Sequence, residues 1–96
     1  MGPPAVAGVS WRISPQPVLS PRDAFFAPRV RVPAADAAGR VAAETIAPDP
    51  PGIPAIAPGE LLTTDLLDAL RDEARAGSRM AGACDPTLET LLVVRA

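Results

Sequence analysis

Residues 47–60 read A-P-D-P-P-G-I-P-A-I-A-P-G-E and hold five of the thirteen prolines in the chain. Proline fixes φ at about −65° and lacks a backbone N–H, so this run cannot form the interior of a helix or a central strand. The residue before each proline is also pushed toward extended geometry. The stretch therefore predicts a stiff, bent, extended loop, with Gly52 and Gly59 as the points where the chain reverses.

The elements expected around this loop are short and of mixed type. Ser20 is a helix N-cap with Pro21 at the first helical position, and this helix must stop before Pro28. Alternation of polar and apolar residues predicts a strand at 29–32. A short helix is expected at 33–38, ended by Gly39. Further strands are expected at residues 41–47, 53–57, 78–84 and 91–94, with a capped turn at 85–89.

The clearest helix signal begins at Thr63, an N-cap whose flanking Leu62 and Leu67 form a hydrophobic staple, and it ends at Gly77. Its apolar stripe consists of Leu66, Leu67, Leu70 and Ala74. The charged residues of this helix predict a solvated face. Its three aspartates do not predict a metal site, because hard cations need oxygens that converge from several segments. Short strands mixed with helices indicate an α+β domain over residues 20–96, preceded by a largely disordered, Pro-rich lead-in at 1–19.

Composition limits the classes of function. Nine basic and eleven acidic residues give a net charge of −2, which argues against nucleic-acid binding. No apolar run is long enough to span a bilayer and no secretory leader is apparent, so a cytoplasmic location is expected. The single cysteine, Cys84, excludes an internal disulfide and is expected to be a small buried apolar residue.

The chain contains no His, no Tyr and no Lys. Without an amine it cannot form the usual Schiff base with pyridoxal phosphate, and without His it lacks the commonest general base and metal ligand. Self-sufficient catalysis is therefore not expected. No residue is assigned a catalytic, cofactor-binding or metal-ligating role.

Four blocks, in order, resemble the C-terminal domain of the Orn/Lys/Arg decarboxylases. They are S-P-R-D-A-F-F-A-P at 20–28, V-P-A-A-D-A-A-G-R-V-A-A-E at 32–44, P-P-G-I-P-A-I-A-P-G-E at 50–60 and D-P-T-L-E-T at 85–90. The resemblance implies a fold-type-I family that decarboxylates lysine, ornithine or arginine on pyridoxal phosphate, as carbon–carbon lyases of polyamine metabolism. It also implies that the cofactor-binding large domain lies upstream of the module seen here.

The resemblance leads to three expectations. The first is a stand-alone or truncated C-terminal domain that binds no cofactor by itself and supports the assembly of a pyridoxal-phosphate-binding large-domain protein. The second is a non-catalytic interaction or regulatory module that associates with itself. The third is the remnant of a truncated decarboxylase gene. Which basic amino acid the parental enzyme would use is left open.

Twelve residues of the matched blocks are candidates for the interface: Phe25, Phe26, Glu44, Pro50, Pro51, Gly52, Pro54, Pro58, Gly59, Glu60, Asp85 and Pro86. For the phenylalanines, either one ring meets an adjoining domain or both lie in the core. Glu44 either pairs with an arginine, such as Arg40 or one in a neighbouring domain, or faces solvent. Glu60 either bonds across the interface or acts as a local turn acceptor.

One position departs from the family pattern. The loop of the family usually carries an aromatic residue, typically Tyr, before Pro-Pro-Gly, and here the residue is Asp49. A carboxylate cannot be buried there without a partner. Either Asp49 points to solvent and the loop packs more loosely, or the requirement for an aromatic residue at this position no longer applies to this chain. Both alternatives put in doubt a contact between this loop and a catalytic domain.

Overall fold

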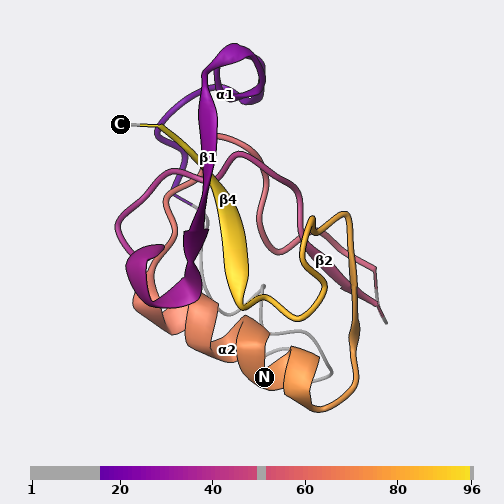
Figure 1. Cartoon of the computed structure of the whole chain (residues 1–96). Coiled ribbons are helices and arrows are strands. Elements are labelled where there is room, and N and C mark those ends of the chain that lie inside the picture. Colours follow the sequence, from indigo (N-terminus) through magenta and orange to yellow (C-terminus); the bar gives the residue numbers. More distant parts are fainter. Residues whose placement is uncertain (1–15, 50–51, 96) are drawn as a thin grey trace.

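The computed structural model describes residues 16–49 and 52–95. Two helices and two small antiparallel sheets enclose one core, so the expected α+β class is confirmed (Figure 1). The elements in chain order are α1 (Pro21–Phe26), β1 (Arg29–Pro33), the 3-10 turn η2 (Ala34–Asp36), β2 (Ala47–Asp49), α2 (Thr64–Arg75), β3 (Arg79–Ala81) and β4 (Thr90–Val94). No helix in these two ranges is long and apolar enough to cross a bilayer.

Both helices begin as the capping signals predict. The Ser20 hydroxyl accepts from the Asp23 N–H at 3.0 Å, with Pro21 at the start of α1. The Thr63 hydroxyl accepts from the Leu66 N–H at 3.2 Å and starts α2. Each cap satisfies a backbone donor that has no partner within the helix, and this is worth about 1 kcal/mol.

The core lies between α2 and the β1–β4 sheet, with Val30 opposite Val93 and Val32 opposite Leu91 in the sheet. The stripe of α2 enters it as predicted, with Leu66, Leu67 and Leu70 all buried. Its largest fully buried aliphatic side chains come from segments between 46 and 93: Ile46, Ile56, Leu62, Leu70, Leu88, Leu91 and Val93. Burial of each such side chain contributes about 1.5–3 kcal/mol to the stability of the fold.

Three expected strands are shorter or displaced. The predicted strand at 41–47 is present only as isolated bridges at Val41, Ala42 and Ile46, and β2 begins where that strand should have ended. The segment 53–57 contributes one bridge, between Ile56 and Ile46, and 78–84 shortens to β3. In the strand expected at 41–47 the interruption falls at Glu44, whose inward side chain accepts from two backbone amides.

The expected helix at 33–38 is instead the three-residue η2, since Pro33 completes β1 and stands at the N-cap of the turn. Contacts also begin before Ser20. The Gln16 carbonyl accepts from the Leu61 N–H at 2.8 Å, and the Val18 and Leu19 amides donate to the Gly59 carbonyl. The remainder of the predicted lead-in, residues 1–15, lies outside the described residues.

Candidate functional site

The largest exposed apolar side chains in the described part of the chain include two adjacent phenylalanines on α1. Phe25 is 64% exposed and Phe26 is 72% exposed, so the alternative that placed both in the core is wrong. Only Ala24 of α1 is buried, because this helix of six residues touches the body through one face. Figure 1 shows α1 at the end of the molecule opposite α2, next to the C-terminal end of β4.

Two exposed arginines that share one face of β1 extend this surface, which we call the α1–β1 patch and define as Arg22, Phe25, Phe26, Arg29 and Arg31. The two rings pack edge to face, with centroids 5.1 Å apart and an interplanar angle of 89°. The Arg22 guanidinium lies 5.8 Å from the Phe26 centroid, and that of Arg29 lies 5.6 Å from the Phe25 centroid.

Arg29 also ties the patch to the body. Its guanidinium donates to the Phe25 carbonyl at 2.7 Å and to the Ala43 carbonyl at 3.4 Å. Edge-to-face and cation–π contacts are each worth roughly 0.5–1 kcal/mol at exposed sites. Together these contacts restrain two apolar rings that are exposed to solvent.

Glu44 occupies the interior instead of a surface. It is 8% exposed, and its Oε1 accepts from the Cys84 N–H at 2.9 Å while Oε2 accepts from the Leu92 N–H at 2.7 Å. Neither predicted alternative, an arginine partner or a solvent-facing position, is correct. The carboxylate joins segments that are 40 and 48 residues away in sequence, so its role is to hold β4 and the β3–β4 connection together.

The second half of the Pro-rich loop is likewise part of the fold. Gly59 is buried with φ of +94°, and a Cβ there would overlap the Leu19 carbonyl oxygen and lie 2.9 Å from its carbon. Pro58 beside it is half-buried. The Glu60 carboxylate accepts from the Ala57 N–H at 2.9 Å, which matches the turn-acceptor alternative.

The loop residues 49 and 52–54 are exposed, whereas 47 and 48 are buried. Gly52 and Pro54 are exposed, Ile53 is 58% exposed, and Asp49 at the end of β2 is also exposed. The alternative in which Asp49 points to solvent is therefore confirmed. Pro50 and Pro51, two further interface candidates, lie outside the described residues.

Asp85 forms the expected turn. Its Oδ1 accepts from the Thr87 N–H and hydroxyl at 2.9 and 2.6 Å, and its Oδ2 accepts from the Thr90 N–H and hydroxyl, both at 3.0 Å. Hydrogen bonds from the Thr87 side chain, and then from its amide and from Thr90, lower the pKa of Asp85 to about 2. Leu88 inside the turn adopts φ of +59°, which allows its side chain to reach the core.

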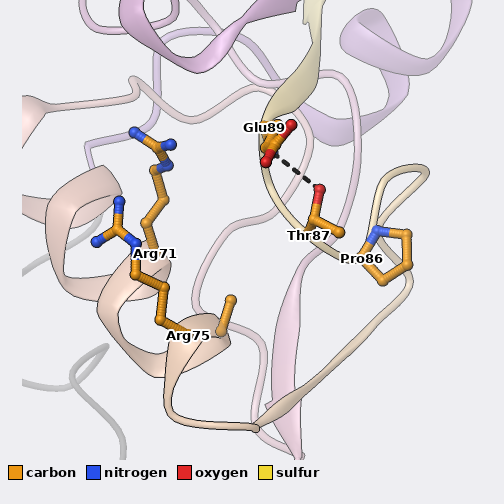
Figure 2. Close-up of a pocket in the computed structure, with 6 residues that line it drawn as sticks. Arg71, Arg75, Pro86, Thr87 and Glu89 are labelled. Atoms are coloured by element: carbon orange, nitrogen blue, oxygen red, sulfur yellow. Dashed lines mark hydrogen bonds between the residues drawn. The ribbon is translucent and has the colours of Figure 1, made fainter.

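A surface hollow of about 280 Å³ lies between the C-terminal half of α2 and this turn, lined by Arg71, Ala74, Arg75, Pro86, Thr87 and Glu89 (Figure 2). Arg75 forms an ion pair with Asp72 at 2.9 Å, and the Thr87 hydroxyl is committed to Asp85. Charges of both signs line the hollow, but none of these groups forms the pair of nucleophile and base that covalent catalysis needs.

Pyridoxal phosphate does not fit the groups present. The chain has no Lys to hold it, and the hollow in Figure 2 offers guanidinium, hydroxyl and carboxylate groups but no amine. Within residues 16–49 and 52–95, no three potential ligands converge on a metal position. The expectation of a buried Cys84 is wrong, since this thiol is exposed.

Sequence reasoning missed the inward turn of Glu44 and the bracing of the rings by arginine. The first had no local signal, because its two amide partners come from distant segments. The second was visible as spacing: Arg22 precedes Phe26 by four residues and Arg29 follows Phe25 by four, which brings side chains together on a helix or just past its end.

These observations define a small α+β domain with one braced aromatic surface, and comparison with known proteins gives its family. Residues 7–82 match the family described as the Orn/Lys/Arg decarboxylase, C-terminal domain, so the chain belongs to that family. An arginine decarboxylase of Bacillus anthracis is 44% identical over 77 residues, and one of Bacillus subtilis is 36% identical over 77 residues. Each match covers 80% of this chain but only 16% of the relative.

Solved structures agree with this assignment. Lysine decarboxylase A from Pseudomonas aeruginosa superposes with a TM-score of 0.71 at 27% identity, covering 90% of this chain and 14% of that one. The constitutive lysine decarboxylase of E. coli gives a TM-score of 0.69 at 24% identity, covering 90% and 14%. The chain therefore corresponds to a small part of the length of these enzymes.

Proposed function

We propose that this chain is a non-catalytic C-terminal module that supports the assembly of an amino-acid decarboxylase, with the pyridoxal-phosphate-binding large domain supplied from outside residues 1–96. The single observation that carries the proposal is the extent of the match: most of this chain aligns with 16% of the arginine decarboxylases. The absence of Lys and the lack of fit to the cofactor support it. The assembled enzyme would act in the cytoplasm as a lyase that forms a polyamine precursor.

The exposed aromatic rings supply a physical reason for such a partner. Soluble monomers rarely leave large contiguous apolar patches uncovered, and aromatic residues with arginine are enriched where proteins bind each other. The α1–β1 patch combines both residue types in one rigid surface.

The test is assembly in trans. The Bacillus anthracis arginine decarboxylase would be produced without the segment that matches this chain, and the purified chain would be added at micromolar concentration. We expect a complex in size-exclusion chromatography, and decarboxylation of arginine only in the mixture. Failure to associate at these concentrations would contradict the proposal, as would carbon dioxide release by the 96-residue chain alone.

A second function, a self-associating interaction module, is favoured by the same exposed phenylalanines. Analytical ultracentrifugation separates the two. Self-association predicts a sedimentation coefficient that rises with protein concentration, whereas a module built for a different partner remains monomeric until that partner is added.

A further inference from the structure

We propose that the α1–β1 patch is the docking surface, and that it recognises a partner surface which is acidic and has an apolar hollow for two phenyl rings. The inference rests on the proposed function and deepens it, because it names the surface of this chain and the chemistry of the partner. The occupant to which it commits is the large catalytic domain.

Charge is the first argument. Three arginines (Arg22, Arg29 and Arg31) lie in or beside the patch against one acidic residue, Asp23, although the whole chain has a net charge of −2. The helix α2, at the other end of the molecule (Figure 1), carries four carboxylates (Asp65, Asp68, Asp72 and Glu73) against two arginines (Arg71 and Arg75). The chain thus gathers positive charge around the exposed Phe25 and Phe26, and a partner surface of opposite sign complements it.

Rigidity is the second argument. A ring that is already held by a neighbouring ring and a guanidinium loses little side-chain entropy when it binds. Phe25 and Phe26 meet this condition through the contacts to each other, to Arg29 and to Arg22. The exposed Ile53 of the Pro-rich loop is aliphatic, so it has no ring that an edge-to-face or cation–π contact could hold.

Position is the third argument. The relatives carry most of their length outside the matched segment, and the matched family is the C-terminal domain, so the rest of each relative precedes it. In this chain α1 is the first helix described, and the segment 16–19 that leads into it is bonded to the Gly59 carbonyl and to Leu61. In such a relative, the preceding chain would enter beside α1, close to the patch.

A second copy of the chain is the weaker occupant. An isologous contact through the patch would bring the three arginines of one copy toward those of the other, and like charges that face each other across an interface oppose association.

The experiment measures binding of four variants of the full chain to the truncated Bacillus anthracis enzyme by biolayer interferometry. Phe25→Ser/Phe26→Ser should weaken binding about 30-fold or more, as loss of an aromatic hot spot does. Arg22→Glu/Arg31→Glu should slow association about tenfold or more. Arg29 is left in place because its guanidinium bonds two carbonyls. In the wild type, association should slow as NaCl rises from about 0.05 to about 0.5 M, and this dependence should weaken in the arginine variant.

Two matched controls locate the contact. Arg79→Glu reverses an exposed charge on β3, and Ile53→Ser removes an exposed aliphatic side chain from the loop. Both should bind within about twofold of the wild type. An effect of Ile53→Ser that equals the effect of the phenylalanine variant would overturn the inference in favour of the loop, and equal effects of Arg79→Glu and of the arginine variant would overturn the charge argument.

The outcomes separate this inference from the proposed function. If the wild-type chain binds and the patch variants bind equally well, the inference fails and the proposed function stands. If the wild-type chain does not bind, both fail.

If the truncated enzyme does not fold, a chimera replaces it, in which the full-length relative carries this chain in place of its own matching segment. In the chimera, the same patch variants should expose the junction to trypsin, and unchanged cleavage would overturn the inference. A dimer of the isolated chain that is lost in Phe25→Ser/Phe26→Ser would assign the patch to self-association instead.

Discussion

Two blocks of the family pattern behave in opposite ways in this structure. The block at 20–28 turns its largest side chains, Phe25 and Phe26, into solvent, whereas the end of the block at 50–60 buries Gly59 and bonds the partly buried Glu60 to its own turn. Both were expected to contribute to one interface. The difference shows that a residue in a family block serves the fold where a close backbone approach or a turn requires it, and stays exposed where nothing in the described part of the chain covers it.

The two blocks are connected through Gly59, which bonds to the segment just before the block at 20–28. Its carbonyl accepts from the Val18 and Leu19 amides at 2.8 and 3.0 Å, and its own N–H donates to the Ala42 carbonyl at 2.8 Å. The buried half of the loop thus holds the segment that leads into α1. Four substitutions test the contrast between the two blocks, and they follow in order of decreasing expected effect on stability.

The largest effect is expected for Gly59→Ala. The new Cβ would overlap the Leu19 carbonyl, and a left-handed φ by itself costs about 1–2 kcal/mol for alanine, so the unfolding free energy should fall by about 3 kcal/mol or more. Urea denaturation followed by circular dichroism measures it. Gly39→Ala is the control: its φ is +86° but no atom lies within 4 Å of the new Cβ, so only the backbone cost of about 1–2 kcal/mol applies. Equal losses in the two variants would refute the close approach at Gly59.

Glu44→Gln should cost about 1.5–3 kcal/mol. The glutamine amide can accept through one oxygen only, so its NH2 group meets either the Cys84 or the Leu92 N–H, and that donor loses its partner. The same denaturation experiment applies, with the exposed Glu89→Gln expected within about 0.5 kcal/mol of the wild type. A Glu44→Gln protein as stable as the wild type would show that the carboxylate does not hold the two segments together.

A smaller effect is expected from protonation of Asp85. The pKa of Asp85 in the folded chain is about 2, below the ordinary 3.8. Its four hydrogen bonds therefore stabilise the fold fully at a pH above the ordinary pKa, and this stabilisation is lost as the pH falls from about 4 to about 2. Because the side chain is partly open to solvent, the contribution is about 1–2 kcal/mol. Urea midpoints between about pH 2 and pH 5 should drop less in Asp85→Asn than in the wild type. Parallel pH profiles would contradict this assignment.

The smallest effect on stability should come from the patch. Phe25→Ser/Phe26→Ser removes two exposed rings that fill no core position, so the unfolding free energy should change by no more than about 1 kcal/mol, mainly from the lost ring and guanidinium contacts. Thermal unfolding at matched concentration gives the comparison. A loss as large as that of Gly59→Ala would mean that α1 contributes to the core, and the contrast between the two blocks would disappear.

Much of the fold was predictable because its signals are local. The caps at Ser20 and Thr63, the stripe of α2 and the Asp85 turn each depend on residues within one or two helical turns of each other. The strands between 41 and 57 were not predictable in this way. Their pattern favoured regular ladders, but the bonds from Glu44 to Cys84 and Leu92 span tens of residues and reshape the backbone between Ala42 and Ile46.

The sequence by itself determined the α+β class, the capped starts of α1 and α2, the lack of an amine for the cofactor and the family resemblance, because capping, periodicity, composition and ordered blocks can all be read along the chain. Only the tertiary structure decided that Glu44 is buried, that Gly59 is a point of close approach, and that Phe25 and Phe26 stand in solvent. The physical reason is that burial depends on which distant segments cover a residue, and a linear pattern of apolar and polar residues does not contain that information.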